Sequence, residues 1–186
     1  MRDPDPSWKA FKELLATPDL PELGPAPRAS RLPLGELNRR VEQFIEQTHL
    51  APTLQPLVRS AALLWQDYLD QSHALSQNIP TADGSFLHGI MHRREPDYSN
   101  AKYWFLRVGK HPCFPDVARQ VTRWLETIGE TELAAKLAPR GHWDPSAFVD
   151  ACEEAAERPS SDPRVQILKA IQENEFDCLL AQWFVR

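Results

Sequence analysis

Apolar side chains recur along most of the chain at intervals of three and four residues, which is the spacing of one helix face. In the segment 34–45 these positions hold Leu34, Leu37, Val41, Phe44 and Ile45. Charged and amide side chains fill the positions between them. No segment shows the persistent alternation of apolar and polar residues that indicates a β-strand. The pattern therefore predicts an all-α protein, a compact single-domain bundle of many helices.

Capping and turn residues divide this pattern into separate helices. We predict helices over residues 7–15, 34–45, 53–77, 85–95, 98–108, 115–128, 130–138 and 145–157, and from 163 onward. Ser7 and Thr53 can cap two of them, and Asp97 or Ser99 a third. Aspartates directly before Pro145 and Pro163 are typical of helix starts.

The N-terminal part of the chain differs from the rest in its proline content. Five prolines fall within residues 18–33. Each proline fixes its own φ angle and removes a backbone donor, so this stretch is expected to be an extended arm. We therefore divide the chain into a short helix with a proline-rich arm (1–33) and a helical domain (34–186). A chain of 186 residues suits one domain.

Composition narrows the function classes. The formal net charge is −5, which argues against a general nucleic-acid or anionic-membrane binder. No apolar run approaches the length of a membrane span. The N-terminal sequence MRDPDPSW has no apolar signal core, so a cytoplasmic location is expected.

The three cysteines, Cys113, Cys152 and Cys178, form no CxxC pair, so they predict no zinc knuckle and no thioredoxin-like motif. They are expected to be reduced thiols that serve as small apolar residues. A nucleophilic Cys113 close to His111 is the sharper alternative.

Ionisable and aromatic side chains are concentrated in residues 88–111. Here five arginines and lysines face only two acidic residues, although the whole chain is acidic. Such density is costly to bury and difficult to explain as a solvated helix face. We therefore expect the functional site in this segment.

The stretch HGIMHRREPDYSNAKYWFLRVGKHPCF, residues 88–114, resembles the central signature of a family of uncharacterised proteins. The signature of that family reads roughly HxIxHRREPDxxNxKYWFRRVGxHPxF, and Leu106 stands where it has an arginine. The preceding segment SQNIPTADGSF, residues 76–86, resembles the approach to that signature. The resemblance implies no reaction, because the family has no established activity.

Histidine spacing gives a metal-binding hypothesis. His88 and His92 are four residues apart, so their imidazoles project from one helix face. Asp70 and His73 are three residues apart on the preceding predicted helix, a spacing used by ligand pairs in helical bundles. If the two helices face each other, the four side chains can hold one divalent metal ion that activates water.

The preferred hypothesis is a small anionic metabolite, bound with or without hydrolase-type chemistry. Arg93 or Arg94 is expected to clamp a phosphate or carboxylate together with Arg107. His88 or His92 can act as general acid or base near neutral pH. The remaining candidate ligand-binding residues are Asn100, Tyr103, Trp104 and His111, of which Tyr103 and Trp104 can form a stacking wall.

A structural alternative stays open. The arginines can form an internal ion-pair network with Glu95 and Asp97 that fixes the corner at Pro96. The protein would then be a non-catalytic structural or interaction protein. Solvent access to His88, His92 and Arg107 separates these hypotheses.

Overall fold

The computed structural model describes residues 6–184, and within this range it contains α-helices, two short 3-10 turns and no β-strand. This confirms the predicted all-α class. The α-helices are α1 (Pro6–Leu15), α2 (Leu34–Thr48), α3 (Gln55–Trp65), α4 (Leu69–Ser76), α5 (Ala82–Arg94), α6 (Tyr98–Val108), α7 (Phe114–Thr127), α8 (Thr131–Leu137), α9 (Pro145–Glu154) and α10 (Pro163–Ala181). The 3-10 turns are η1 (Pro139–Gly141) and η2 (Gln182–Phe184). The first five residues of the predicted N-terminal segment and the last two of the helical domain lie outside the described residues.

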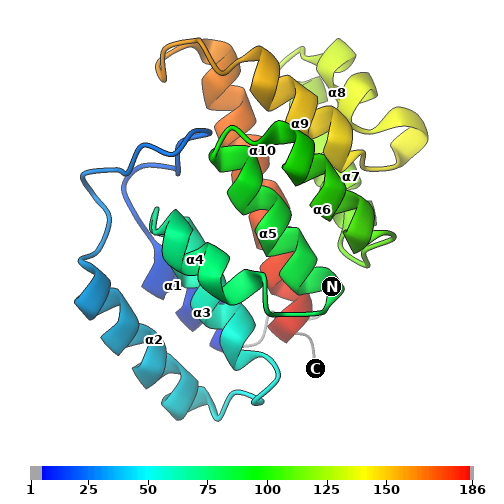
Figure 1. The fold of residues 1–186 in the computed structure, drawn as a ribbon. Helices are drawn as coiled ribbons and strands as arrows, with labels where there is room; N and C mark the ends of the chain where they lie inside the picture. The colour runs from blue at the N-terminus through cyan, green and yellow to red at the C-terminus, as the bar shows by residue number, and fades with distance from the viewer. Residues whose placement is uncertain (1–5, 185–186) are drawn as a thin grey trace.

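Helix α5 occupies the middle of the molecule. Figure 1 shows α1 to α4 on one side of it, α6 to α9 on the other, and α10 behind it. Helix α5 packs against α3, α4 and α6, while α10 packs against α7 and α9. As a result, every residue of α5 from Gly84 to Arg94 is buried, including its histidines and arginines. The predicted site therefore lies inside the fold, and its polar groups need internal partners or a ligand.

The N-terminal helix and the arm are both attached to this body. Phe11 of α1 is fully buried, with its ring 5.1 Å from Phe44 and 5.8 Å from Phe184. Pro6 is already helical, so Ser7 lies within α1 and not at the capping position that was predicted for it. The arm between α1 and α2 contains no helix, as its prolines predicted. Buried Arg28 ties the arm to Asp67, with 2.8 Å between Nε and the carboxylate.

The prediction of one helix over residues 53–77 is wrong. Helix α3 ends at Trp65 and α4 begins at Leu69, with Asp67 between them in the left-handed region at φ 62°. Aspartate tolerates this backbone region better than most residues. The carboxylate of Asp67 accepts hydrogen bonds from Arg28 and Arg94. This break turns α4 so that it lies against α5.

Capping residues set the ends of the central helices. Helix α5 begins at Ala82, three residues earlier than predicted, because the Thr81 hydroxyl accepts a hydrogen bond from the Gly84 amide. Asp97 caps α6, and Asp144 and Asp162 cap α9 and α10, as predicted. The predicted cap Thr53 lies before Leu54, which precedes α3.

No helix within residues 6–184 has both the length and the apolar character that a membrane span requires.

Candidate metal centre

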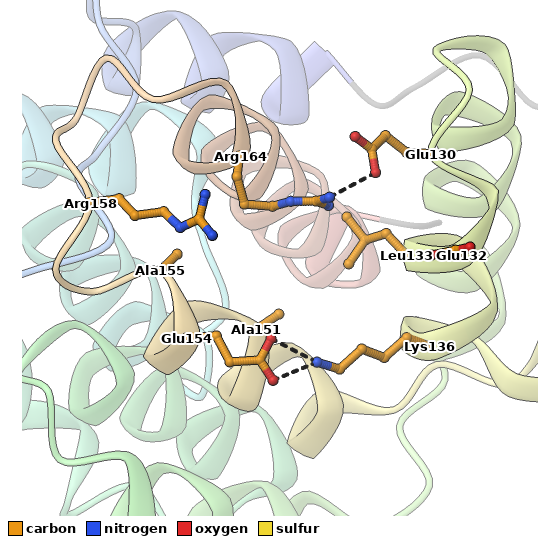
Figure 2. A pocket seen from close by; sticks show the side chains of 9 residues that line it. All are labelled: Glu130, Glu132, Leu133, Lys136, Ala151, Glu154, Ala155, Arg158 and Arg164. Carbon is orange, nitrogen blue, oxygen red and sulfur yellow. Dashed lines mark hydrogen bonds and ion pairs between the residues drawn. The ribbon is translucent and has the colours of Figure 1, made fainter.

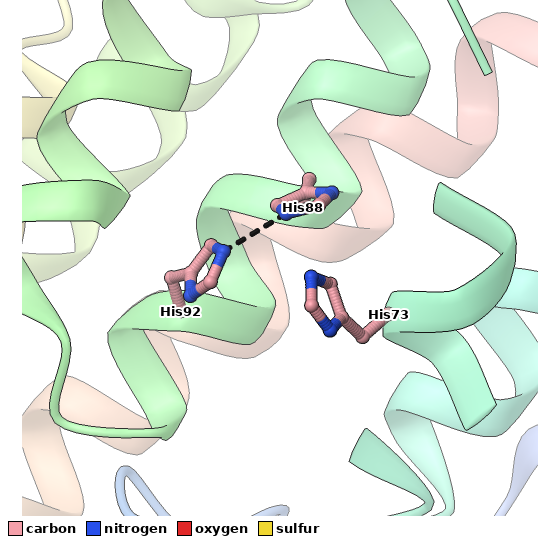
Figure 3. A group of neighbouring side chains, drawn as sticks. All are labelled: His73, His88 and His92. Atoms are coloured by element: carbon pink, nitrogen blue, oxygen red, sulfur yellow. Dashed lines mark hydrogen bonds between the residues drawn. The ribbon is translucent and has the colours of Figure 1, made fainter. Parts of the chain in front are cut away.

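Three histidines from two helices converge at the contact between α4 and α5. We call His73, His88 and His92 the histidine triad. Their ring centroids lie 4.7 Å apart for His73 and His88, 5.3 Å for His73 and His92, and 4.7 Å for His88 and His92. One ring nitrogen from each lies within 4.8 Å of the other two. Figure 3 shows the His73 ring reaching from α4 towards the two rings on α5. The triad can therefore hold a metal ion.

The two histidines of α5 face each other closely. The Nε2 atoms of His88 and His92 are 2.8 Å apart, which requires one of them to donate a proton and the other to accept it. Nitrogen ligands about 2.0–2.1 Å from a tetrahedral zinc ion lie about 3.3 Å from each other. If the two rings move apart by about half an ångström, a metal ion fits between the two nitrogens in place of the proton.

The other ring nitrogens of these histidines have polar partners. Ser76 Oγ lies 3.2 Å from His88 Nδ1 and also donates to the carbonyl oxygen of His73 at 3.4 Å. His92 Nδ1 lies 3.5 Å from Glu95 Oε2 and 3.8 Å from Asp97 Oδ2. Outer partners of this kind fix the ring orientation, while the Nε2 atoms that would bind a metal face each other. The Asn100 side-chain amide nitrogen lies 3.1 Å from His92 Nε2, so a metal ion bound at that atom would displace this contact.

Burial keeps the α5 histidines neutral. His88 is 2% exposed, and Trp104 stacks on its ring at 4.0 Å. Burial lowers the pKa of His88 to about 3, helped by the neighbouring His92 and His73. Burial also lowers the pKa of His92, although the negative charge of Asp97 acts against this shift. Both imidazoles are therefore unprotonated at neutral pH, which is the form that binds metals.

The accessible side of the triad is acidic. His73 is half-buried, and next to it Glu95 and Asp97 keep 30% and 47% of their side chains exposed. Burial raises the pKa of Glu95; His73 lowers it, whereas Asp70 and Asp97 raise it further. Carboxylates grouped around neutral imidazoles attract a cation more than an anion.

Asp70, predicted as a metal ligand, is exposed and does not belong to the converging group. The helix break at Asp67 changes the direction of α4 relative to the single helix that was predicted. His73 therefore meets α5 while Asp70 remains at the rim.

Arg93 is not placed to clamp a ligand. It is fully buried and donates to Glu175 of α10 at 2.7 Å. Its guanidinium also lies 4.3 Å from the ring of Phe148. Arg93 is therefore not available to clamp a ligand, because its guanidinium already pairs with the Glu175 carboxylate of α10.

Arg94 has internal partners as well. It is 1% exposed, donates to Asp67 at 2.6 Å and to the carbonyl oxygen of Leu64 at 2.7 Å. Internal ion pairs thus exist, but their carboxylates are not the predicted Glu95 and Asp97. The real partners lie 82 residues from Arg93 and 27 residues from Arg94 in sequence.

Of the other predicted site residues, Arg107 lies on the surface of α6, and His111 lies between α6 and α7. Arg107 is exposed on α6, 5.1 Å from the Trp104 ring, and it donates to the Tyr103 hydroxyl at 3.3 Å. His111 lies outside the triad. Its Nε2 is 3.0 Å from Asp83 Oδ1, and its Nδ1 accepts from the Cys113 amide.

The Cys113 thiol is fully buried beside His111 Nδ1 at 2.9 Å, and burial raises its pKa. A buried thiol of raised pKa is a poor nucleophile. Cys113 therefore has the environment of a core residue.

The sequence analysis did not identify the residue that contacts the triad, Ser76, or the carboxylates that pair with the buried arginines. Ser76 had one local signal, because it begins the segment 76–86 that precedes the signature. Asp67 and Glu175, the partners of the buried arginines, had no such signal in the sequence.

Comparisons with protein families, with curated proteins and with solved structures find no match to this chain.

Proposed function

We propose that this protein binds a divalent transition metal ion, zinc first among them, through His73, His88 and His92. The observation that carries the proposal is the convergence of three imidazole nitrogens within 4.8 Å, from two helices. Three histidine ligands with an open fourth position are a known arrangement for catalytic zinc. The partners of His88 and His92 at Nδ1 add the outer contacts that such ligands usually have.

The charges around the triad favour a metal over direct binding of an anion. The nearby carboxylates of Asp70, Glu95 and Asp97 disfavour a free phosphate or carboxylate at this point. The clamp hypothesis also loses Arg93 and Arg94 to internal ion pairs. A small anionic molecule fits this proposal as a substrate that binds to the metal ion and meets Arg107, the exposed arginine of α6 that lies 5.1 Å from the Trp104 ring.

The chemistry that suits such a centre is metal-assisted hydrolysis. A bound divalent ion acts as a Lewis acid and lowers the pKa of water to about 7. Glu95 lies at the accessible side of the triad and can accept the proton that water releases. Hydrolysis would add the oxygen of that water to the electrophilic atom of the substrate and return its proton to the leaving group.

A second candidate is a non-catalytic structural or interaction protein. The observation in its favour is the burial of two signature arginines in ion pairs with Glu175 and Asp67. Such pairs specify a fold without any ligand. The two candidate functions depend on different residues of the signature. The buried arginines support the structural role, and the histidines that meet α4 support the metal site.

Elemental analysis tests the proposal. The chain is purified without a histidine tag, incubated with Zn²⁺, desalted and measured for zinc by mass spectrometry. We expect close to one equivalent in the native chain and a loss of at least tenfold in affinity for His88→Gln and His92→Gln.

His142→Gln serves as the matched control, because His142 is exposed and outside the triad. Circular dichroism verifies that each variant is folded. Absence of zinc from the native chain, or equal zinc in the folded His88→Gln and His92→Gln variants, contradicts the proposal.

A further inference from the structure

A cavity lies away from the histidine triad. It has a volume of about 680 Å³ and is formed by the end of α6, the start of α7 and the loop before α9. Its walls are mainly apolar and aromatic, and they include Phe105, Leu106, Phe114, Trp143 and Pro145. Volume and lining fall within the range of small-molecule pockets.

Two features of the wall are unusual for a surface hollow. Leu106 is 77% exposed at the edge, which costs free energy unless something covers it. Trp143 is buried, and its indole N–H has no acceptor among the described residues. The indole ring of Trp143 is part of the cavity wall, so its N–H signal can report a ligand that packs against that wall.

The lining of this cavity holds one lysine, Lys110, and one carboxylate, Asp144. Lys110 is exposed and has no ion pair within residues 6–184. The carboxylate in the lining, Asp144, already accepts from the amides of Ser146 and Ala147 at the start of α9. His111 is committed to Asp83 and to the Cys113 amide. An anionic group next to Lys110 therefore meets an unpaired cation.

The contrast with the pocket in Figure 2 supports this reading. That pocket, about 310 Å³ between α8, α9 and α10, is lined mostly by charged side chains. Most of its charges are paired, with Glu130 3.0 Å from Arg164 and Lys136 2.8 Å from Glu154, while Glu132 has no ion pair within residues 6–184. Those pairs need no ligand, whereas Lys110 has no such partner.

We infer that the cavity between α6, α7 and the loop before α9 binds an amphipathic monocarboxylate, a small molecule with an apolar body and one anionic group. The apolar walls cover its body, and Lys110 pairs with its carboxylate. This site is independent of the proposed metal centre, because none of its lining residues belongs to the triad.

Octanoate, octanol and octylamine test the inference, because they share an apolar chain and differ in charge. Each is titrated into the full chain while the indole N–H signal of Trp143 is followed by NMR, assigned with Trp143→Phe. We expect saturable binding with octanoate about twofold to fivefold tighter than octanol, the gain of an exposed ion pair. Octylamine is expected to bind most weakly.

Variants locate the site. Lys110→Met should remove the preference for octanoate over octanol, while Lys9→Met, at an exposed lysine of α1 with no ion pair to residues 6–184, should keep it. Leu106→Glu places a negative charge at the exposed edge and should weaken octanoate more than octanol. His88→Gln should leave octanoate binding unchanged, so failure here is distinguishable from failure of the metal proposal.

Three results overturn the inference: no saturable shift of the Trp143 signal, tighter binding of octylamine than of octanoate, or an unchanged preference in Lys110→Met.

Discussion

The Nε2 atoms of His88 and His92 lie 2.8 Å apart across one turn of α5. At this distance one ring donates its Nε2 proton to the other while both rings stay neutral, and one further proton would place a buried positive charge on the pair. His73 completes the group from α4. A further proton and a metal ion would therefore compete for the same ring nitrogens.

Ser76→Ala tests the role of the outer partners. Ser76 Oγ donates to the His73 carbonyl, so it is available to accept the Nδ1 proton of His88 and thereby leaves His88 Nε2 without one. Removing the hydroxyl frees the imidazole to change tautomer and to rotate. We expect zinc affinity to fall about tenfold to a hundredfold, measured by competition with a chromophoric chelator.

Ser161→Ala is the matched control, because Ser161 is exposed and far from the triad in sequence. Its zinc affinity should equal that of the native chain. If Ser76→Ala also retains full affinity, Ser76 does not orient His88.

The low pKa of His88 predicts the pH dependence of the metal-free protein. In the folded state the pKa of His88 is about 3, against 6.5 in the unfolded chain. Between these values the unfolded state binds more protons, so the free energy of unfolding decreases as the pH falls. For this one histidine the decrease from pH 7 to pH 5 is about 2 kcal/mol.

Urea unfolding in the presence of a chelator measures this dependence for the native chain and for His88→Gln. The variant should lose less stability than the native chain over the same range. The range above pH 5 is chosen because the pKa of Asp67 is held below its usual 3.8: burial raises it, but the charge of Arg94 and hydrogen bonds from Arg28 outweigh burial. Equal slopes for the two proteins would show that His88 is not buried in its neutral form.

Local sequence patterns predicted the parts of this site that lie on one helix. The spacing of His88 and His92 predicted a shared face, and Asp97 predicted the start of α6. His73 was identified by its spacing from Asp70, although only His73 joins the triad. These features depend on helix periodicity and capping, which act over a few residues.

The partners of the buried arginines could not be predicted in this way. Glu175 is on α10, and nothing near it in sequence distinguishes it from the exposed acidic residues of the C-terminal part. Asp67 lies within a stretch that continues a helical pattern, yet it adopts a positive φ and ends α3. Its role comes from Arg28 and Arg94, which tertiary packing brings to it.

Asp67→Asn is expected to be strongly destabilising. Asparagine tolerates the same backbone conformation, so the substitution removes the charge and little else. It leaves Arg28 and Arg94, both nearly inaccessible to solvent, without a counter-charge. Loss of one partner from a buried ion pair costs about 3–5 kcal/mol, which denaturant unfolding at pH 7 can measure.

The matched control is Glu154→Gln, which removes the charge from the exposed ion pair with Lys136. Its expected cost is below about 1 kcal/mol, because exposed ion pairs contribute little. Similar losses in the two variants would mean that the Asp67 pair is solvated and not part of the core.

Gly84→Ala tests how closely the connection between α4 and α5 must pack. A Cβ atom at position 84 would lie 2.3 Å from the carbonyl oxygen of Ile79 and 2.6 Å from its Cβ, so the backbone must move. The helix preference of alanine, about 0.5–1 kcal/mol, does not offset overpacking of about 1–3 kcal/mol. Movement of Ile79 away from α5 also separates His73 from His88, so zinc affinity should fall together with stability.

Gly35→Ala provides the comparison, because a Cβ there has no atom within 4 Å and Gly35 is exposed in α2. That variant should match the native chain in zinc affinity and equal or slightly exceed it in stability. Stability is read from urea unfolding and affinity from chelator competition on the same samples. A Gly84→Ala protein with native stability and native affinity would show that the triad does not depend on close packing between Ile79 and α5.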